Sequence, residues 1–186
     1  MRRRFLILVE FFSKLIGKVY VPTYFKKSTA ERYSNLVRIQ IGLQTGELRQ
    51  GDIIFSRTRG HLSNLFLGTW THTGLLTLDG LVIEALTDGG VQKTPLVKFI
   101  MGKDNLCIKR PKISYNSTQV IKISESLVGL EYDWSFSSEN KIYCSELVRK
   151  GYGSPKWLPL VTRFGSQTLS PMDLFKNKTL QKIMEV

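Results

Sequence analysis

From residue 51 onward the sequence predicts an α+β fold, because segments with strand patterns come first and helix patterns and a loop-rich tail follow. The two strongest observations are a hairpin pattern over residues 71–86 and a short helix pattern that begins at Cys144. The chain has 186 residues, 42% of them hydrophobic, which is enough for one substantial core. We therefore expect one domain over residues 46–186, preceded by an amphipathic, basic helical extension over residues 1–45.

The N-terminal segment, MRRRFLILVEFFSKLIGKVYVP, combines a basic head with an amphipathic helical pattern. It begins like a signal peptide, but Glu10, Ser13 and Lys14 interrupt the apolar stretch and no small-x-small cleavage site follows. The apolar face of residues 1–20 suits packing on the protein's own domain, and it also suits an anionic membrane surface. Both interpretations stay open. Because no cleavable signal is evident, we expect a cytoplasmic protein, either free or at the inner surface of the membrane.

The elements that precede Cys144 are predicted from their periodicity and their flanking turn residues. They are a helix over 28–43, a strand over 51–56, a hairpin over 71–86, a strand over 106–110, and a helix over 117–129 closed by Gly129. Asp52 follows a glycine at a strand start, where a turn-stabilising role is expected. The tail after residue 155 contains several prolines, and its last predicted element is a helix near 171–183.

The stretch KIYCSELVRKGY places a cysteine directly before a short helix. Glu146 suits the first turn of this helix, Lys150 suits the last turn, and Gly151 falls where a left-handed C-cap is expected. The partial positive charge at a helix N-terminus favours the thiolate of Cys144 over the thiol, whose free pKa is about 8.5. The other cysteine, Cys107, lies in an apolar strand pattern and is expected to be an inert core thiol.

A nucleophilic cysteine needs a base, and the chain contains only two histidines. His61 lies in the basic loop RTRGHLSN, where a solvated or capping role is the simplest interpretation. His72 lies inside the strand pattern TWTHTGLL, where a histidine has no propensity reason to be, although a lone strand histidine is more often structural than catalytic. His72 is therefore the candidate base.

Whether a carboxylate can hold His72 depends on the hairpin register. A two-residue loop at Asp79-Gly80 puts His72 and Glu84 on opposite faces of the sheet. A three-residue loop, with Gly80 left-handed, pairs Gly74 with Glu84 instead and makes Glu84 the diagonal neighbour of His72 on the same face. The functional interpretation requires the three-residue loop.

At this point the motifs GDIIFSRT, WTHTGLL, VIEA, EYDWSF and YCSELV, in this order, resemble those of the YiiX/YebB-like permuted papain-like amidases. These are relatives of the NlpC/P60 cysteine peptidases and of lecithin retinol acyltransferase. The resemblance covers roughly residues 50–150. It implies a circularly permuted papain-like fold: an antiparallel, partly barrelled sheet with the nucleophile at a helix N-terminus.

The resemblance also implies roles for individual residues. Cys144 is the expected nucleophile, His72 the base and Glu84 the residue that orients the base. Tyr132, in the motif EYDWSF, corresponds to a position at the wall of the active site. Tyr132 and Tyr143 are the candidates for contacts with the substrate or with an oxyanion. Asp133 is expected to stabilise a turn, and Glu146 to be a structural carboxylate of the first helical turn.

The implied activity is hydrolysis of an amide bond, in a cell-wall peptide or another small peptide, through an acyl-thioester on Cys144. Two alternatives stay open. One is a lipid acyltransferase, thioesterase or phospholipase on the same fold, and the other is a non-catalytic basic module that binds membranes, which the net charge of +12 favours. No nucleic-acid motif accompanies this charge, so no specific nucleic-acid partner is expected. Two cysteines form neither a disulfide framework nor a metal cluster, so we expect no cofactor and no metal. The oligomeric state is not predicted.

Overall fold

The computed structural model describes residues 27–57, 69–136, 138, 140–163 and 165–186. The expected amphipathic helix of residues 1–20 and the loop residue His61 lie outside the described residues. No helix in the described ranges is long and apolar enough to cross a membrane.

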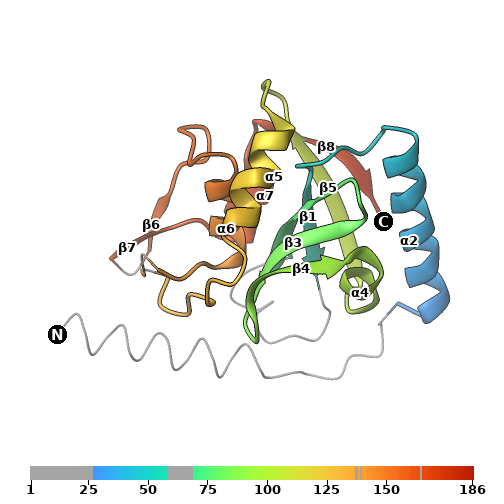
Figure 1. Ribbon diagram of the computed structural model, residues 1–186, viewed down its shortest axis with the longest axis horizontal. Coiled ribbons are helices and arrows are strands. Elements are labelled where there is room, and N and C mark those ends of the chain that lie inside the picture. The colour runs from blue at the N-terminus through green and yellow to red at the C-terminus, as the bar shows by residue number, and fades with distance from the viewer. Residues whose placement is uncertain (1–26, 58–68, 137, 139, 164) are drawn as a thin grey trace.

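A six-stranded antiparallel sheet with the order β4-β3-β2-β1-β5-β8 forms the centre of the molecule (Figure 1). Within the described residues no pairing joins the two edge strands β4 and β8, so the sheet is open. The antiparallel sheet together with the helices confirms the expected α+β class. The strands are β1 (Ile53–Arg57), β2 (His72–Leu76), β3 (Leu81–Leu86), β4 (Gly90–Pro95), β5 (Asn105–Pro111) and β8 (Leu180–Glu185).

Helices cover both faces of this sheet, because neighbouring strand residues point to opposite sides and both sides are apolar. Ile54 and Leu76 face the helices α2 (Thr29–Gln44) and α4 (Leu96–Met101). Ile53 and Leu75 lie in the cluster on the other face. That second face carries α5 (Ser117–Ser126), α6 (Cys144–Gly151) and α7 (Pro171–Lys176), which lie on the left in Figure 1.

Helix α2 is part of the core. Its N-cap Ser28 and Glu31 form a capping box, in which each side chain bonds the other residue's backbone N–H. Leu36 and Ile39 on its inner face are buried in the same cluster as the sheet residues of that face. The predicted helix over 28–43 is thus confirmed, and it packs directly on the domain that follows it.

The hairpin of β2 and β3 has the three-residue loop that the functional interpretation requires. The backbone N–H of Thr77 donates to the carbonyl of Leu81 at 3.0 Å, and Gly80 adopts a left-handed φ of +74°. Gly74 lies opposite Glu84. The register therefore places Glu84 and His72 on the same face of the sheet, the face covered by α4.

Two expectations for the helices on the other face are wrong. Gly151 is the last residue of α6 and is helical, whereas the left-handed glycine is Gly153, with φ +76°. Gly151 is glycine because α5 and α6 pack closely there: a Cβ would lie 2.3 Å from the Oγ of Ser124. Helix α5 ends at Ser126, before the predicted end at Gly129, which has a left-handed φ of +94°.

The predicted helix over 171–183 is also wrong in its second half. Helix α7 begins with a capping box between Ser170 and Asp173 and ends at Lys176, because Asn177 is extended. The chain then continues as β8, which pairs with β5. The tail additionally contains a small hairpin of β6 (Val161–Arg163) and β7 (Ser166–Thr168).

Candidate active site

His72 and Glu84 form a short contact in the structure. The Nε2 atom of His72 lies 2.6 Å from Oε2 of Glu84, and both side chains are largely buried. The diagonal arrangement across β2 and β3 accounts for this contact, since Gly74 has no side chain to lie between them. The carboxylate occupies Nε2, which leaves Nδ1 of the ring for another partner.

That partner is Cys144, the first residue of α6. His72 and Cys144 stabilise each other's charged forms, and the backbone amides of Thr73 and Ser145 also favour the thiolate of Cys144. Cys144 is only 4% exposed. The structure thus brings the three residues that the sequence singled out into one continuous chain of contacts.

The pKa values of this group favour an ion pair. Burial lowers the pKa of His72, but the hydrogen bonds and charges of Cys144 and Glu84 outweigh burial and raise it to about 9. Burial raises the pKa of Cys144, but the hydrogen bond and charge of His72, followed by the two backbone amides, bring it below its ordinary value. The arrangement therefore stabilises a thiolate beside an imidazolium.

Glu84 keeps its negative charge in this environment. Burial raises its pKa, but the hydrogen bond and charge of His72 outweigh burial, and Thr94 and Lys103 act in the same direction as His72. The net result is a lowered pKa. An ionised Glu84 fixes the orientation of the imidazole and supports its positive charge.

Cys107 behaves differently because its surroundings differ. It lies in β5, is fully buried, and packs among the apolar side chains of the second face. Burial is the main cause that raises its pKa to about 11. The expected contrast between an inert core thiol and an activated helix N-terminal thiol is present in the structure.

The two tyrosines that were expected near the substrate have different surroundings. Tyr132 forms a parallel bridge with Ile142, two residues before Cys144. Burial raises the pKa of Tyr132 well above its ordinary value, and the charge of Cys144 adds to this, so its hydroxyl stays protonated near the sulfur. The hydroxyl of Tyr143 instead accepts a hydrogen bond from the backbone N–H of Leu169 at 3.1 Å. Tyr143 thus links the start of α6 to the C-terminal segment at Leu169.

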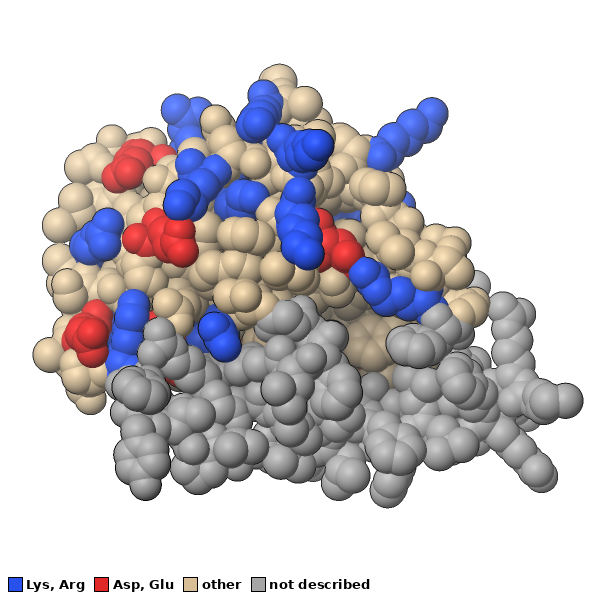
Figure 2. All heavy atoms as spheres, turned by 180° about the vertical axis from the view of Figure 1, so that it is seen from behind, with Lys and Arg blue, Asp and Glu red and all other residues tan. Residues whose placement is uncertain are grey.

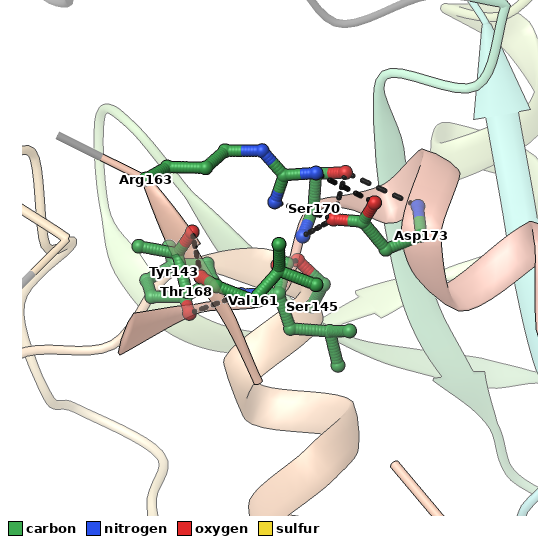
Figure 3. Close-up of polar contacts among 8 residues, drawn as sticks. Tyr143, Ser145, Val161, Arg163, Thr168, Ser170 and Asp173 are labelled. Atoms are coloured by element: carbon green, nitrogen blue, oxygen red, sulfur yellow. Dashed lines mark hydrogen bonds and ion pairs between the residues drawn. The ribbon is translucent and has the colours of Figure 1, made fainter. Parts of the chain in front are cut away.

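The start of α6 is joined to this segment on both sides of the nucleophile. Tyr143 accepts from the N–H of Leu169, and the hydroxyl of Ser145 donates to the carbonyl of the same residue. Close by, Arg163 makes a bidentate ion pair with Asp173 at 2.6 and 2.7 Å, and Asp173 also accepts from Ser170 (Figure 3). Sequence reasoning did not find this connection, because its central partner is the backbone of Leu169. Only the motif SPMD, a capping box with proline at its first turn, was visible in the sequence.

The remaining carboxylates that were expected to be structural lie in structural contacts. Asp133 accepts hydrogen bonds from the backbone of Ser135 and of Ser138 and so closes a turn. Asp52 accepts from the backbone N–H of Arg49 and forms a buried ion pair with Arg110 at 2.6 Å. The Nζ atom of Lys150 lies 3.2 Å from Oε1 of Glu146, which is one helical turn earlier in α6.

One face of the molecule shows how positive charge is distributed over the described residues. Figure 2 shows the face opposite to that of Figure 1, on which Lys and Arg side chains are spread over the described surface with fewer Asp and Glu among them. Dispersed charge of this kind is typical of a solvated basic surface.

A sheet-borne histidine and carboxylate, facing a cysteine at a helix N-terminus, define the class of papain-like cysteine enzymes. The chain belongs to the family of permuted papain-like amidases, the YaeF/YiiX or C92 family, whose model matches residues 47–184. The match extends beyond the residues 50–150 that carry the sequence resemblance. It includes α7 and nearly all of β8, so the tail is part of the family fold.

A solved structure supports the same fold. The chain is similar to the crystal structure of the metalloprotein yiiX from Escherichia coli O157:H7, with a TM-score of 0.62 and 23% sequence identity. The similarity covers 75% of this chain and 98% of that one. A comparison with curated proteins gives no match.

The related yiiX is a metalloprotein, and the described donor residues of this chain differ from what a metal site needs. Across the described ranges, no group of three or more His, Cys, Asp or Glu side chains is placed so that it could hold a metal ion. His72 and Glu84 are engaged with each other. The described donors therefore do not fit a metal, and no step is assigned to one.

Proposed function

We propose that the protein is a cysteine hydrolase that cleaves an amide bond in a small peptide, such as a cell-wall peptide. The observation that carries this proposal is the contact chain from Glu84 through His72 to Cys144, with 2.6 Å between Glu84 and His72. Membership of a permuted papain-like amidase family supports the reaction type. The peptide substrate is an inference from the amidase family to which the chain belongs.

In the first half of the reaction, the thiolate of Cys144 attacks the carbonyl carbon of the substrate and forms a carbon–sulfur bond. The carbonyl oxygen becomes an oxyanion next to the start of α6. The backbone N–H of Cys144 is the natural donor to this oxyanion, because the first amides of a helix have no partner within the helix. The protonated hydroxyl of Tyr132 is the candidate for a second donor.

The tetrahedral intermediate collapses when the carbon–nitrogen bond breaks. His72, as imidazolium, gives its proton to the leaving amine, and an acyl-thioester remains on Cys144. The now neutral His72 takes a proton from a water molecule, which attacks the thioester. The carboxylic acid leaves and the thiolate–imidazolium pair is restored. Glu84 holds the imidazole in one orientation through both halves of the cycle.

Two groups of substrates test this proposal. We would incubate the protein, without detergent, with a set of short peptides and N-acyl amino acid amides, and in parallel with fatty acyl esters and phospholipids. Release of a new amine is measured in the first set and release of fatty acid in the second. The Cys144→Ala variant serves as the control, and we expect amine release from wild type alone.

The possible results separate the alternatives. Release of fatty acid without any amine release would contradict amide hydrolysis and favour the lipid acyltransferase or phospholipase alternative. No turnover in either set, together with a Cys144 that is no more reactive than a free thiol, would contradict an enzyme and leave the basic membrane-binding module. Steeply salt-dependent binding to anionic vesicles is then expected.

A further inference from the structure

Helix α4 covers the catalytic histidine with an aromatic ring. Phe99, which is buried, lies with its ring centroid 6.0 Å from that of His72, at an interplanar angle of 35°. The chain leaves α4 through the C-cap Gly102, and the next residue is Lys103. The ammonium of Lys103 lies 5.6 Å from the centroid of the same Phe99 ring. One phenyl ring therefore contacts both the catalytic imidazole and a lysine ammonium.

Within the described ranges, Lys103 lacks the carboxylate partner that two other partly buried cations have, and it also lacks the backbone carbonyl that Lys109 reaches in Phe175. Arg32 is paired with Asp104, and Arg110 is paired with Asp52. Among the described residues, no carboxylate lies within ion-pair distance of Lys103, and its ammonium contacts the face of Phe99. A cation–π contact stabilises by only about 0.5–1 kcal/mol at such sites, so it does not by itself explain a half-buried ammonium.

The charges of the candidate site act on this ammonium, which the Phe99 ring links to His72. Burial lowers the pKa of Lys103, while the charges of Glu84, Cys144 and Asp104 oppose burial. Glu84 is engaged with His72 and cannot turn to Lys103 without releasing the base. An anion that arrives from outside, close to Cys144, would be the partner that Lys103 lacks.

We propose that Lys103 determines substrate specificity by binding a carboxylate that lies near the scissile bond, so that the protein prefers acidic peptides. This proposal rests on the proposed function of Cys144 as nucleophile. A peptide supplies such a group as a free α-carboxylate or as an acidic side chain. The compact ammonium can donate to a carboxylate in either orientation. Partial burial strengthens the attraction compared with a solvent-exposed ion pair.

Alkylation of Cys144 tests Lys103 without knowledge of the substrate. Iodoacetamide is neutral and iodoacetate carries a carboxylate, and in both cases the sulfur of Cys144 displaces iodide and forms a thioether. We would measure the rate of modification of Cys144 by mass spectrometry for both reagents and compare the ratio of the two rates. The variants are Lys103→Met, Lys103→Gln and Lys103→Arg. Lys98→Met, which removes an exposed charge from the neighbouring helix α4, is the matched control.

We expect the iodoacetate-to-iodoacetamide ratio to fall about fivefold in Lys103→Met and Lys103→Gln, which is the effect of one partly screened ion pair. The ratio should be kept in Lys103→Arg and in the control. Two variants of Lys103 are used because one of them can fail to fold, which circular dichroism detects.

Other outcomes overturn the proposal. An unchanged ratio means that Lys103 does not bind the carboxylate. An equal loss of rate with both reagents means that Lys103 only positions the catalytic residues. Failure of the proposed function has a separate signature: wild-type Cys144 then reacts with iodoacetamide no faster than a free thiol, while the ratio between reagents still reports on Lys103.

Discussion

Replacement of Gly74 by alanine tests whether the register that places Glu84 beside His72 depends on the absence of one side chain. A Cβ at this position would lie 2.7 Å from Cγ1 of Val82 and 2.8 Å from the backbone oxygen of Ile83. It would also lie 3.3 Å from Cβ of Glu84. Because one of these neighbours is the backbone of β3, the new methyl group must push the two strands of the hairpin apart.

The magnitude follows from this overlap. Overpacking of a buried site typically costs about 1–3 kcal/mol. An alanine also restricts the unfolded chain, which returns about 0.4–1 kcal/mol where the native backbone accepts it. We therefore expect Gly74→Ala to lower the free energy of unfolding by roughly 1–2 kcal/mol. Gly102→Ala is the matched control, since a Cβ there meets nothing within 4 Å and its φ is −86°.

The assay combines stability and reactivity. Urea unfolding followed by tryptophan fluorescence gives the free energy of unfolding, and a lower midpoint with an unchanged slope identifies a change in stability. The rate of Cys144 alkylation by iodoacetamide is measured in native buffer at the same time. We expect it to fall in Gly74→Ala, because movement of Glu84 weakens its 2.6 Å contact with His72. Equal stability and equal Cys144 reactivity in the two alanine variants would refute the reasoning.

Three further predictions concern the charges of the site and of the core. In wild type, alkylation of Cys144 across pH 5 to 9 should begin well below the ordinary thiol pKa, because the imidazolium of His72, with a pKa of about 9, favours the thiolate in this range. His72→Ala should move the curve of alkylation rate against pH to higher pH. An unmoved curve would exclude the ion pair. Glu84→Gln removes the charge that supports the imidazolium, so the alkylation rate of Cys144 at pH 7 should fall about tenfold, whereas an unchanged rate would mean that Glu84 does not act through His72. Arg110→Met leaves the buried carboxylate of Asp52 without its cation and should lower the free energy of unfolding by about 3 kcal/mol in urea titrations. A loss below about 1 kcal/mol would show that the hydrogen bond from the Arg49 amide is enough to satisfy Asp52.

The sequence predicted the hairpin and the geometry of His72 and Glu84 because both depend on local rules. The position of Gly80 sets the loop, the loop sets the register, and the period of two then decides which side chains share a face. The helix start at Cys144 is equally local. The meeting of these two elements was expected only through the family resemblance, since nothing in their spacing fixes how α6 packs on the sheet.

The first part of β8 falls within the predicted helix over 171–183, and the spacing of its apolar residues favours that interpretation. Its apolar residues Leu180, Ile183 and Met184 are spaced as on one face of a helix. The strand can have this spacing because its pairing with β5 shifts register between Ile108 and Lys109, so that Ile183 has no residue opposite it. A bulge changes the phase of the alternation, and the sequence of the strand alone does not reveal the bulge.

The C-terminal segment also determines where the sulfur of Cys144 lies, in addition to the candidate catalytic residues His72 and Glu84. His72 and Glu84 are held by the sheet on the side of α4, whereas Cys144 comes from α6 on the other face, so the position of the sulfur depends on what fixes the start of α6. Ser145, which is fully buried, fixes it by donating to the carbonyl of Leu169.

Ser145→Ala removes that donor and leaves a buried carbonyl unsatisfied, at a cost of about 1–3 kcal/mol. It keeps the backbone N–H of residue 145 and the Cys144–His72 contact, which set the pKa of the thiol. Alkylation of Cys144 should therefore change in its maximal rate while the midpoint of its pH curve stays in place. Ser126→Ala, which removes an exposed hydroxyl bonded within its own helix, is the control. A shifted midpoint would mean that the segment around Leu169 contributes to the charge balance of the site, and an unchanged rate would mean that α6 is held without it.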